Sequence, residues 1–94
     1  MFLLKFSSRF KKDLKSYKYD KVFLVELEKV LDILAKGKDL PDKNFNHPLI
    51  GEFKGCFECY IKPDILLIYK IEKSELIVLL LRVGSHSNLF NGHC

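Results

Sequence analysis

Residues 52–84 read EFKGCFECYIKPDILLIYKIEKSELIVLLLRVG, and this stretch decides the fold. It contains three runs of strand character, at about Glu52–Ile61, Ile65–Glu72 and Leu76–Gly84, each rich in β-branched, aromatic or aliphatic residues. The connections between the runs, Lys62-Pro63-Asp64 and Lys73-Ser74-Glu75, are short, and turns of this length join antiparallel neighbours. The stretch therefore predicts an antiparallel meander.

The segment before the meander predicts one strand and two helices. Residues 2–6 form a short apolar strand, and Ser7 or Ser8 can cap the helix that follows. Asp20 can cap a second helix, which Gly37 ends. The apolar side chains at helical spacing are Phe10, Leu14 and Tyr17 in the first helix and Phe23, Leu27, Val30, Leu31 and Leu34 in the second. Each helix is therefore expected to pack by one face.

The predicted order is β-α-α-β-β-β in an α+β domain, with two helices packed on one face of a mainly antiparallel four-stranded sheet. The region from Lys38 to Gly51, which contains His47, has little periodicity and several turn-forming residues, so we expect a surface loop there. A chain of 94 residues has room for one core, so residues 1–94 are expected to form a single domain. The sheet face without helices is expected to be open and concave, which suits a ligand.

Composition argues against several classes of protein: disordered, membrane-spanning and disulfide-rich. With 48% apolar and 30% charged residues, the chain is typical of a globular domain and unlike a disordered one. The longest apolar run, Leu76–Leu81, is too short to cross a bilayer, the N-terminus lacks a signal-peptide pattern, and an odd number of cysteines argues against a disulfide framework. We therefore expect a cytoplasmic protein without a membrane partner. A net charge of +4 fits a polyanionic partner and equally a solvated surface with a mild basic excess.

Residues 56–61 alternate with a period of two, which sorts their side chains onto the two faces of the first meander strand. Those expected in the core are Phe57, Cys59 and Ile61. Those expected on the open face are Cys56, Glu58 and Tyr60. Asp64 follows this strand and Arg82 lies near the end of the last one, so antiparallel pairing can bring both close to Glu58. His86 and Phe90 lie in a terminal segment that can fold over the same rim.

Each of these residues also has an explanation without chemistry. His47 and His86 could be surface imidazoles, and Asp64 could serve the turn after Pro63. Arg82 could form a surface ion pair with Glu58 across the strands. A phenylalanine such as Phe90, taken alone, is typical of a core.

The segment Cys56-Phe57-Glu58-Cys59 does not predict a zinc or redox site. Residues three apart on a strand point to opposite faces, the second cysteine pair of a zinc ribbon is missing, and no helix N-terminus follows to activate a thiol. We therefore expect neither a metal site nor a cofactor.

Three segments together resemble the YafQ branch of the RelE/ParE toxin superfamily. They are HPLIG at residues 47–51, KPDILLIY at 62–69 and RVGSHSNLF at 82–90. Their order and spacing make the combined pattern far more specific than any one segment. The resemblance implies a RelE-like fold and a bacterial toxin of a type II toxin–antitoxin system, which enters the ribosomal A site and cleaves mRNA. It also implies a cognate antitoxin as partner, with contact to operator DNA only through the antitoxin complex.

Such cleavage needs little beyond proton transfer and charge stabilisation. RNA carries its own nucleophile, the 2′-OH, so the enzyme must remove that proton, stabilise the charged phosphate and protonate the leaving 5′ oxygen, none of which requires a metal. Donation of a proton to the leaving oxygen is assigned to His86, and stabilisation of the phosphate to Arg82. His47 and Asp64 are candidates for removing the 2′ proton or orienting a partner, with help from Glu58.

Four further residues are expected to bind RNA: Phe90 and Tyr60 through their rings, and Lys54 and Lys62 through phosphates. Tyr60 stands where YafQ-like sequences usually carry a second histidine, a departure that concerns catalytic rate and base preference more than the fold. Two other functions stay open: a ParE-like protein that arrests growth by binding DNA gyrase, and a catalytically weakened toxin that acts with its antitoxin as a co-repressor.

Overall fold

The computed structural model describes residues 1–90, without the side chains of Glu52 and Phe90. One sheet contains β1 (Leu3–Phe6), β2 (His47–Pro48), β3 (Phe57–Lys62), β4 (Ile65–Glu72) and β5 (Ile77–Gly84). The α-helices are α1 (Ser8–Leu14), α2 (Lys21–Ala35) and α3 (His86–Phe90). Short 3-10 turns, η1 (Lys15–Tyr17), η2 (Asp42–Asn44) and η3 (Gly51–Phe53), lie in the connections.

The strand order is β1-β5-β4-β3-β2, with β1 parallel to β5 and the other pairs antiparallel. This confirms the α+β fold and its meander, but the sheet has five strands where four were expected. The additional strand, β2, has two residues inside the segment predicted to be a loop, too few to produce a periodic pattern. The first meander strand begins at Phe57 rather than Glu52, because Gly51 and Gly55, with φ of 72° and 94°, turn the chain between them.

The two longer helices begin at the residues that the sequence indicates. The Ser7 side chain accepts a hydrogen bond from the backbone N–H of Phe10 at 2.9 Å, and the Asp20 carboxylate accepts one from Phe23 at 3.0 Å. Gly37, with φ of 71°, follows the end of α2. Within residues 1–90, no helix is long and apolar enough to cross a bilayer.

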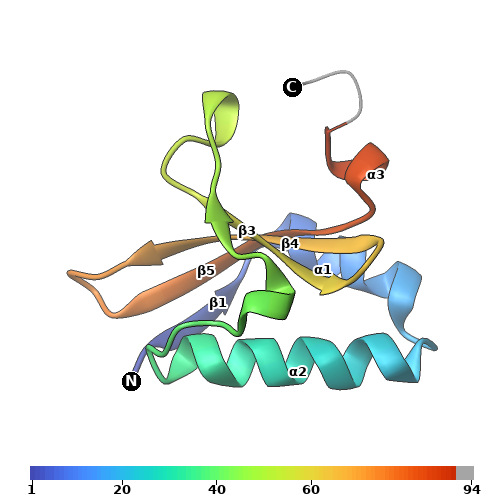
Figure 1. Cartoon of the computed structure of the whole chain (residues 1–94), viewed down its shortest axis with the longest axis horizontal. Helices are drawn as coiled ribbons and strands as arrows, with labels where there is room; N and C mark the ends of the chain where they lie inside the picture. The colour runs from blue at the N-terminus through green and yellow to red at the C-terminus, as the bar shows by residue number, and fades with distance from the viewer. Residues whose placement is uncertain (91–94) are drawn as a thin grey trace.

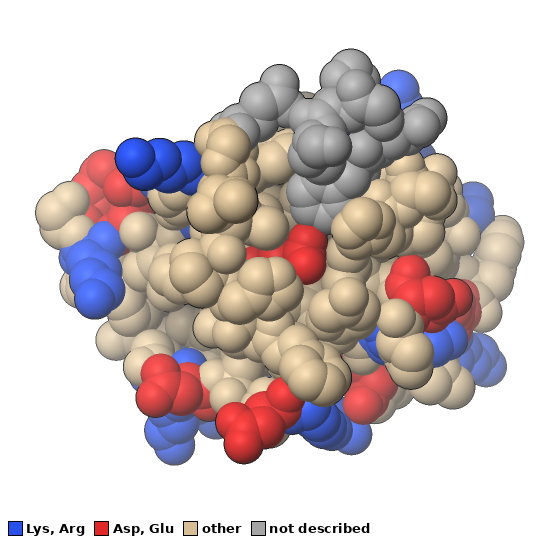
Figure 2. All heavy atoms as spheres, turned by 45° about the horizontal axis from the view of Figure 1, so that its top comes forward, with Lys and Arg blue, Asp and Glu red and all other residues tan. Residues whose placement is uncertain are grey.

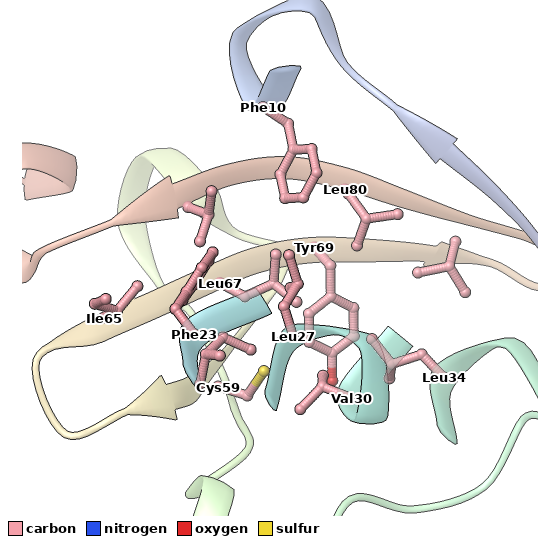
Figure 3. Close-up of a cluster of buried hydrophobic side chains, with 13 residues drawn as sticks. Phe10, Phe23, Leu27, Val30, Leu34, Cys59, Ile65, Leu67, Tyr69 and Leu80 are labelled. Carbon is pink, nitrogen blue, oxygen red and sulfur yellow. The ribbon is translucent and has the colours of Figure 1, made fainter. Parts of the chain in front are cut away.

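The main hydrophobic core joins side chains of the sheet with those of the two longer helices, and α2 runs along one side of the sheet (Figure 1). Apolar side chains of α2 point toward the strands in Figure 3, as the helical spacing predicts. The buried members from the helices are Phe10, Phe23, Leu27, Val30 and Leu34, and those from the strands include Cys59, Ile61, Leu67, Tyr69, Val78, Leu80 and Val83. The predicted core face of β3 is therefore confirmed.

The opposite face of the sheet is less open than expected. A second cluster buries Cys56, Leu66, Ile68 and Leu89, with Leu49, Phe53, Tyr60 and Leu81 packed against it. Besides side chains of the strands, it contains residues of α3 and of the segment between β2 and β3, which project from the sheet on the side away from α2 (Figure 1). The expectation of a bare concave face was wrong, because the chain folds two short segments back over the apolar side chains of β4.

Side chains from the start of the chain close the edge of β5 beyond the end of β1. The pairing of β1 with β5 stops at Phe6, opposite Leu80. The Ser7 hydroxyl then donates to the carbonyl of Leu81 at 2.9 Å, and the Asp13 carboxylate accepts from the N–H of Val83 at 3.1 Å. These two contacts satisfy strand-edge groups that no strand covers.

Candidate active site

The predicted site residues His47 and Glu58 meet at the short β2–β3 pairing. They are direct partners in the strand register, and His47 Nε2 lies 3.2 Å from Glu58 Oε1. The Glu58 side chain is 7% exposed and the His47 side chain 47%, so the carboxylate is shielded while the imidazole faces solvent. The other ring nitrogen, Nδ1, lies 2.6 Å from the carbonyl oxygen of Phe45.

Both nitrogens of His47 thus face oxygen atoms. A backbone carbonyl only accepts, so Nδ1 must carry a proton in this contact. The other nitrogen, Nε2, lies 3.2 Å from Glu58. Nε2 is thus the ring nitrogen left to exchange a proton, and a carboxyl group lies beside it, which suits general acid–base chemistry.

Two asparagine side chains fix the segment that presents His47. The Asn44 amide donates to the backbone carbonyl of Tyr60 at 2.6 Å, and the buried Tyr69 hydroxyl donates to Asn46 Oδ1. Burial raises the pKa of Tyr69, so this phenol stays protonated and remains a donor. The sequence reasoning missed both asparagines, although two amides flanking Phe45 are a signal of a side-chain-bonded turn.

Arg82 does not approach Glu58 as expected. In the strand register, Arg82 lies opposite Ile68, which lies opposite Glu58, so β4 separates the two charges. Instead, Arg82 Nε lies 2.8 Å from Asp13 Oδ2, and Nη2 donates to Asp13 Oδ1 at 3.3 Å. The expectation that strand pairing brings Arg82 close to Glu58 was therefore wrong, and so was the alternative of an ion pair between them, because the guanidinium is paired with Asp13 of α1.

Asp13 is a third residue that the sequence reasoning missed. Its carboxylate, 14% exposed, binds both the Arg82 side chain and the Val83 backbone. It lies 69 residues away from Arg82 in the chain, so no local pattern connects them. Asp13 thereby fixes both the guanidinium and the strand that leads to α3.

His86 is the first residue of α3 and is exposed. The helix is held down by Leu89, which packs in the second cluster with Leu66 and Ile68. Leu89 also packs against Gly84, where a Cβ atom would lie 3.4 Å from Leu89 Cδ2, at van der Waals contact. The predicted segment over the rim is thus present, whereas the Phe90 side chain lies outside the described part of the chain.

Asp64 is not brought to the His47–Glu58 pair. It is exposed in the β3–β4 turn, and β3 continues for four residues from Glu58 to Lys62, about 13 Å at the strand rise. Asp64 is therefore separated from Glu58 along β3, and the expectation that strand pairing brings the two close was wrong. Burial, together with the charge of Asp64 and then those of Asp13 and Asp20, raises the pKa of Tyr17.

The lysines predicted to bind RNA lie on opposite sides of this region. Lys54 is exposed directly after η3, and Lys62 Nζ lies 3.4 Å from Asp20 Oδ2 at the end of β3. Figure 2 looks at the side of the molecule that carries α3: basic side chains lie mainly around its margin, and uncharged ones occupy most of its middle. An RNA strand on this face would meet lysines at the rim rather than one central basic patch.

The two cysteines of β3 and its approach lie on opposite faces, as predicted. Cys56 belongs to the second cluster and Cys59 to the main core. Burial raises the pKa of the Cys56 thiol, and burial followed by the charge of Glu58 raises that of Cys59 to about 12. Both thiols are therefore poor metal ligands and nucleophiles. Among residues 1–90, no group of three or more His, Cys, Asp and Glu side chains is arranged to hold a metal ion.

Comparison with known proteins finds relatives of matching length and fold. The mRNA interferase toxin YafQ of Escherichia coli K12 is 28% identical over 88 residues, which cover 93% of this chain and 94% of that protein. A crystal structure of a metal-bound toxin from Helicobacter pylori is 43% identical, with a TM-score of 0.87, covering 96% of this chain and 100% of that one. The E. coli DinJ–YafQ complex contains a chain that is 27% identical, with a TM-score of 0.85, covering 97% and 100%.

A family model supports the same relationship. The model described as "Bacterial toxin of type II toxin-antitoxin system, YafQ" matches residues 3–91. This match includes all three segments that carry the sequence resemblance, at residues 47–51, 62–69 and 82–90. The chain therefore belongs to the YafQ family of bacterial toxins from type II toxin–antitoxin systems.

Proposed function

We propose that this toxin is a ribosome-dependent mRNA endoribonuclease that cleaves through attack of the RNA 2′-OH, by general acid–base catalysis and without a metal. The observation that carries the proposal is the contact between the exposed His47 imidazole and the shielded Glu58 carboxylate at 3.2 Å. Relatives of matching length are named mRNA interferase toxins. The cognate antitoxin is its protein partner, by analogy with the DinJ–YafQ complexes, and its place of action is the cytoplasm, where mRNA is translated.

In this proposal His47 removes the 2′ proton. With Nδ1–H bound to the Phe45 carbonyl, the lone pair of a neutral ring lies on Nε2, where the 2′-OH can reach it. Glu58 then stabilises the imidazolium that forms, since its carboxylate already lies beside Nε2. Asp64, at the far end of β3, has no part in this step.

Arg82 and His86 are assigned to the phosphate and to the leaving group. Arg82 offers the phosphate its remaining terminal nitrogen, Nη1, while Asp13 holds Nε and Nη2. His86, exposed at the start of α3, donates a proton to the departing 5′ oxygen. Tyr60, Lys54, Lys62 and Phe90 bind the RNA on either side, and the ribosome supplies the ordered message that so small a domain does not hold alone.

Induced expression without antitoxin tests this function directly. We expect growth to stop and mRNA to be cut in frame with codons, as mapped by sequencing of 5′ ends. Glu58→Gln keeps the size of the side chain but removes the charge beside His47, and we expect it to lower the yield of cuts at least about tenfold. Tyr19→Leu, at an exposed position outside the site, is the matched control.

Two results would contradict this function. Growth arrest with intact messages and altered DNA supercoiling would favour the gyrase-binding alternative. No arrest and no cuts, with binding to the antitoxin retained, would favour a weakened toxin that acts as a co-repressor. The second result would also explain the tyrosine at position 60.

Removal of transition metals is expected to leave cleavage unchanged. The reaction proposed here uses only side chains and the RNA 2′-OH, although a relative 43% identical was crystallised as a metal-bound toxin. Cleavage on purified ribosomes would be measured before and after treatment with a chelator selective for zinc and copper, which spares the magnesium that ribosomes need. Loss of cleavage that returns only on adding a transition metal ion would contradict metal independence.

A further inference from the structure

A cleft of about 730 Å³ lies beside the His47–Glu58 pair, along the outer edge of β3. It exists because β2 pairs only with Phe57 and Glu58, so the rest of β3 has no strand on this side. Phe45, Tyr60, Ile61 and Pro63 form its apolar wall, and Lys43 and Lys62 line it as well. His47 itself is part of the lining, so the cleft is continuous with the proposed catalytic pair.

Phe45 is the unusual member of this wall. Its side chain is 68% exposed, and its backbone has φ of 46°, in the left-handed region that a phenylalanine rarely adopts. Such a conformation persists only where the surroundings enforce it. Here the N–H of Phe45 donates to Asp42 at 3.0 Å, its carbonyl contacts His47 Nδ1, and the neighbouring Asn44 is bonded to β3. The chain therefore keeps the exposed Phe45 ring in place although the backbone conformation of this residue is unfavourable.

The ring of Phe45 meets that of Tyr60 edge to face. The centroids are 5.9 Å apart and the planes are inclined by 77°, and the 68% exposure of Phe45 leaves ring surface for a ligand. Exposed aromatic rings that are fixed in this way stack on nucleobases of any sequence. The volume is also within the range of about 300–1,000 Å³ that is usual for small-ligand pockets.

The charges along the cleft suit a phosphate. Lys43 lies 3.9 Å from Glu26, and Lys62 lies 3.4 Å from Asp20. Both ion pairs are long and partly solvated, hence weak, so a phosphate can compete for either lysine. The Glu26 carboxylate also lines the cleft, but Lys29 binds it at 3.0 Å. An apolar wall with lysines near it favours a nucleotide over an acidic or purely apolar ligand.

We propose that this cleft binds one unpaired nucleotide of the message next to the cleaved phosphate, with its base stacked on Phe45 and its phosphate near Lys43 and Lys62. The inference rests on the proposed endoribonuclease function and extends it to substrate positioning. The carbonyl of Phe45 holds Nδ1 of His47, so the residue that binds the base also orients the imidazole. This contact uses the backbone carbonyl, so it is retained when the side chain of Phe45 is replaced.

The test compares Phe45→Leu, Phe45→Tyr and the exposed-aromatic control Tyr19→Leu on programmed ribosomes. Loss of a base–aromatic stack, about 1–3 kcal/mol per base, corresponds to a rise in KM of roughly 5–150-fold. We expect this rise for Phe45→Leu, with kcat within about threefold of the wild type, and near-normal KM for the other two variants. A message with 2-aminopurine at the flanking position should lose fluorescence on stacking with the wild type and not with Phe45→Leu.

The outcomes separate this inference from the function on which it rests. If the wild type cuts mRNA and Phe45→Leu has unchanged KM and unchanged 2-aminopurine quenching, the nucleotide site is refuted while the function stands. If Phe45→Leu weakens antitoxin binding but not KM, the cleft is a protein-docking surface and the proposal is again refuted. If the wild type cuts no RNA at all, the proposed function itself fails.

Discussion

Arg82→Ala is expected to lower mRNA cleavage by roughly 10²–10⁴-fold, because the guanidinium is the cation assigned to the charge that builds on the phosphate. Arg82→Lys should recover only part of this loss, since an ammonium group lacks the planar fork that binds both Asp13 and a phosphate. The measurement is the rate of single-turnover cleavage on programmed ribosomes, compared with the free energy of unfolding of each variant in urea.

Stability must be measured because Arg82 also has a structural partner. Without the guanidinium, the Asp13 carboxylate keeps only its contact with the Val83 N–H, and leaving a part-buried acceptor short of partners costs roughly 1–3 kcal/mol. Asp13→Asn is the matched control, since it keeps an acceptor for Val83 but removes the charge that holds Arg82. If the cleavage rate of Arg82→Ala, corrected for its folded fraction, equalled that of the wild type, Arg82 would be a purely structural residue.

His86→Ala should lower cleavage by a similar factor, roughly 10²–10⁴-fold, because it removes the proposed proton donor to the leaving oxygen. The side chain is exposed and α3 is anchored by Leu89, so the fold should be unaffected. Added imidazole should restore part of the activity of His86→Ala, as expected for a missing proton-transfer group. Ser87→Ala, at the next exposed position of α3, is the control and should retain full activity.

A substrate whose 5′ leaving oxygen is replaced by sulfur tests the role of His86 as proton donor more directly. Sulfur leaves without a proton, so His86→Ala should cleave this substrate at nearly the wild-type rate. An equal defect on both substrates would assign His86 to another step and would move the leaving-group proton to His47.

Local sequence features predicted most of the fold. The caps at Ser7 and Asp20 and the alternation around Cys59 depend only on residues close in sequence, and the structure confirms them. The strand β2 could not be predicted, because its two residues become a strand only by pairing with β3. The second cluster was missed for a similar reason, since α3 covers β4 through a tertiary contact of Leu89 with Leu66 and Ile68, which no local pattern predicts.

The sequence predicted the types of residue in the candidate site, but not their arrangement in space. Register along β3 placed Glu58 and Tyr60 on the correct face, and the structure adds that His47 is the partner of Glu58. The partner of Arg82 depended on where α1 lies, which no short-range pattern encodes. Asp64 was expected near Glu58 because it follows the same strand, but it lies in the exposed turn beyond the end of β3.

The position of β5 between β1 and β4 has a consequence for folding during synthesis. β1 pairs with β5, which is translated much later, so Leu3 cannot pair before Ile77 has been made. A nascent chain can form α2 early, but the sheet cannot be completed until β5 has emerged from the exit tunnel. A toxin with this topology therefore completes its sheet only after β5 has left the ribosome, however early α2 has formed.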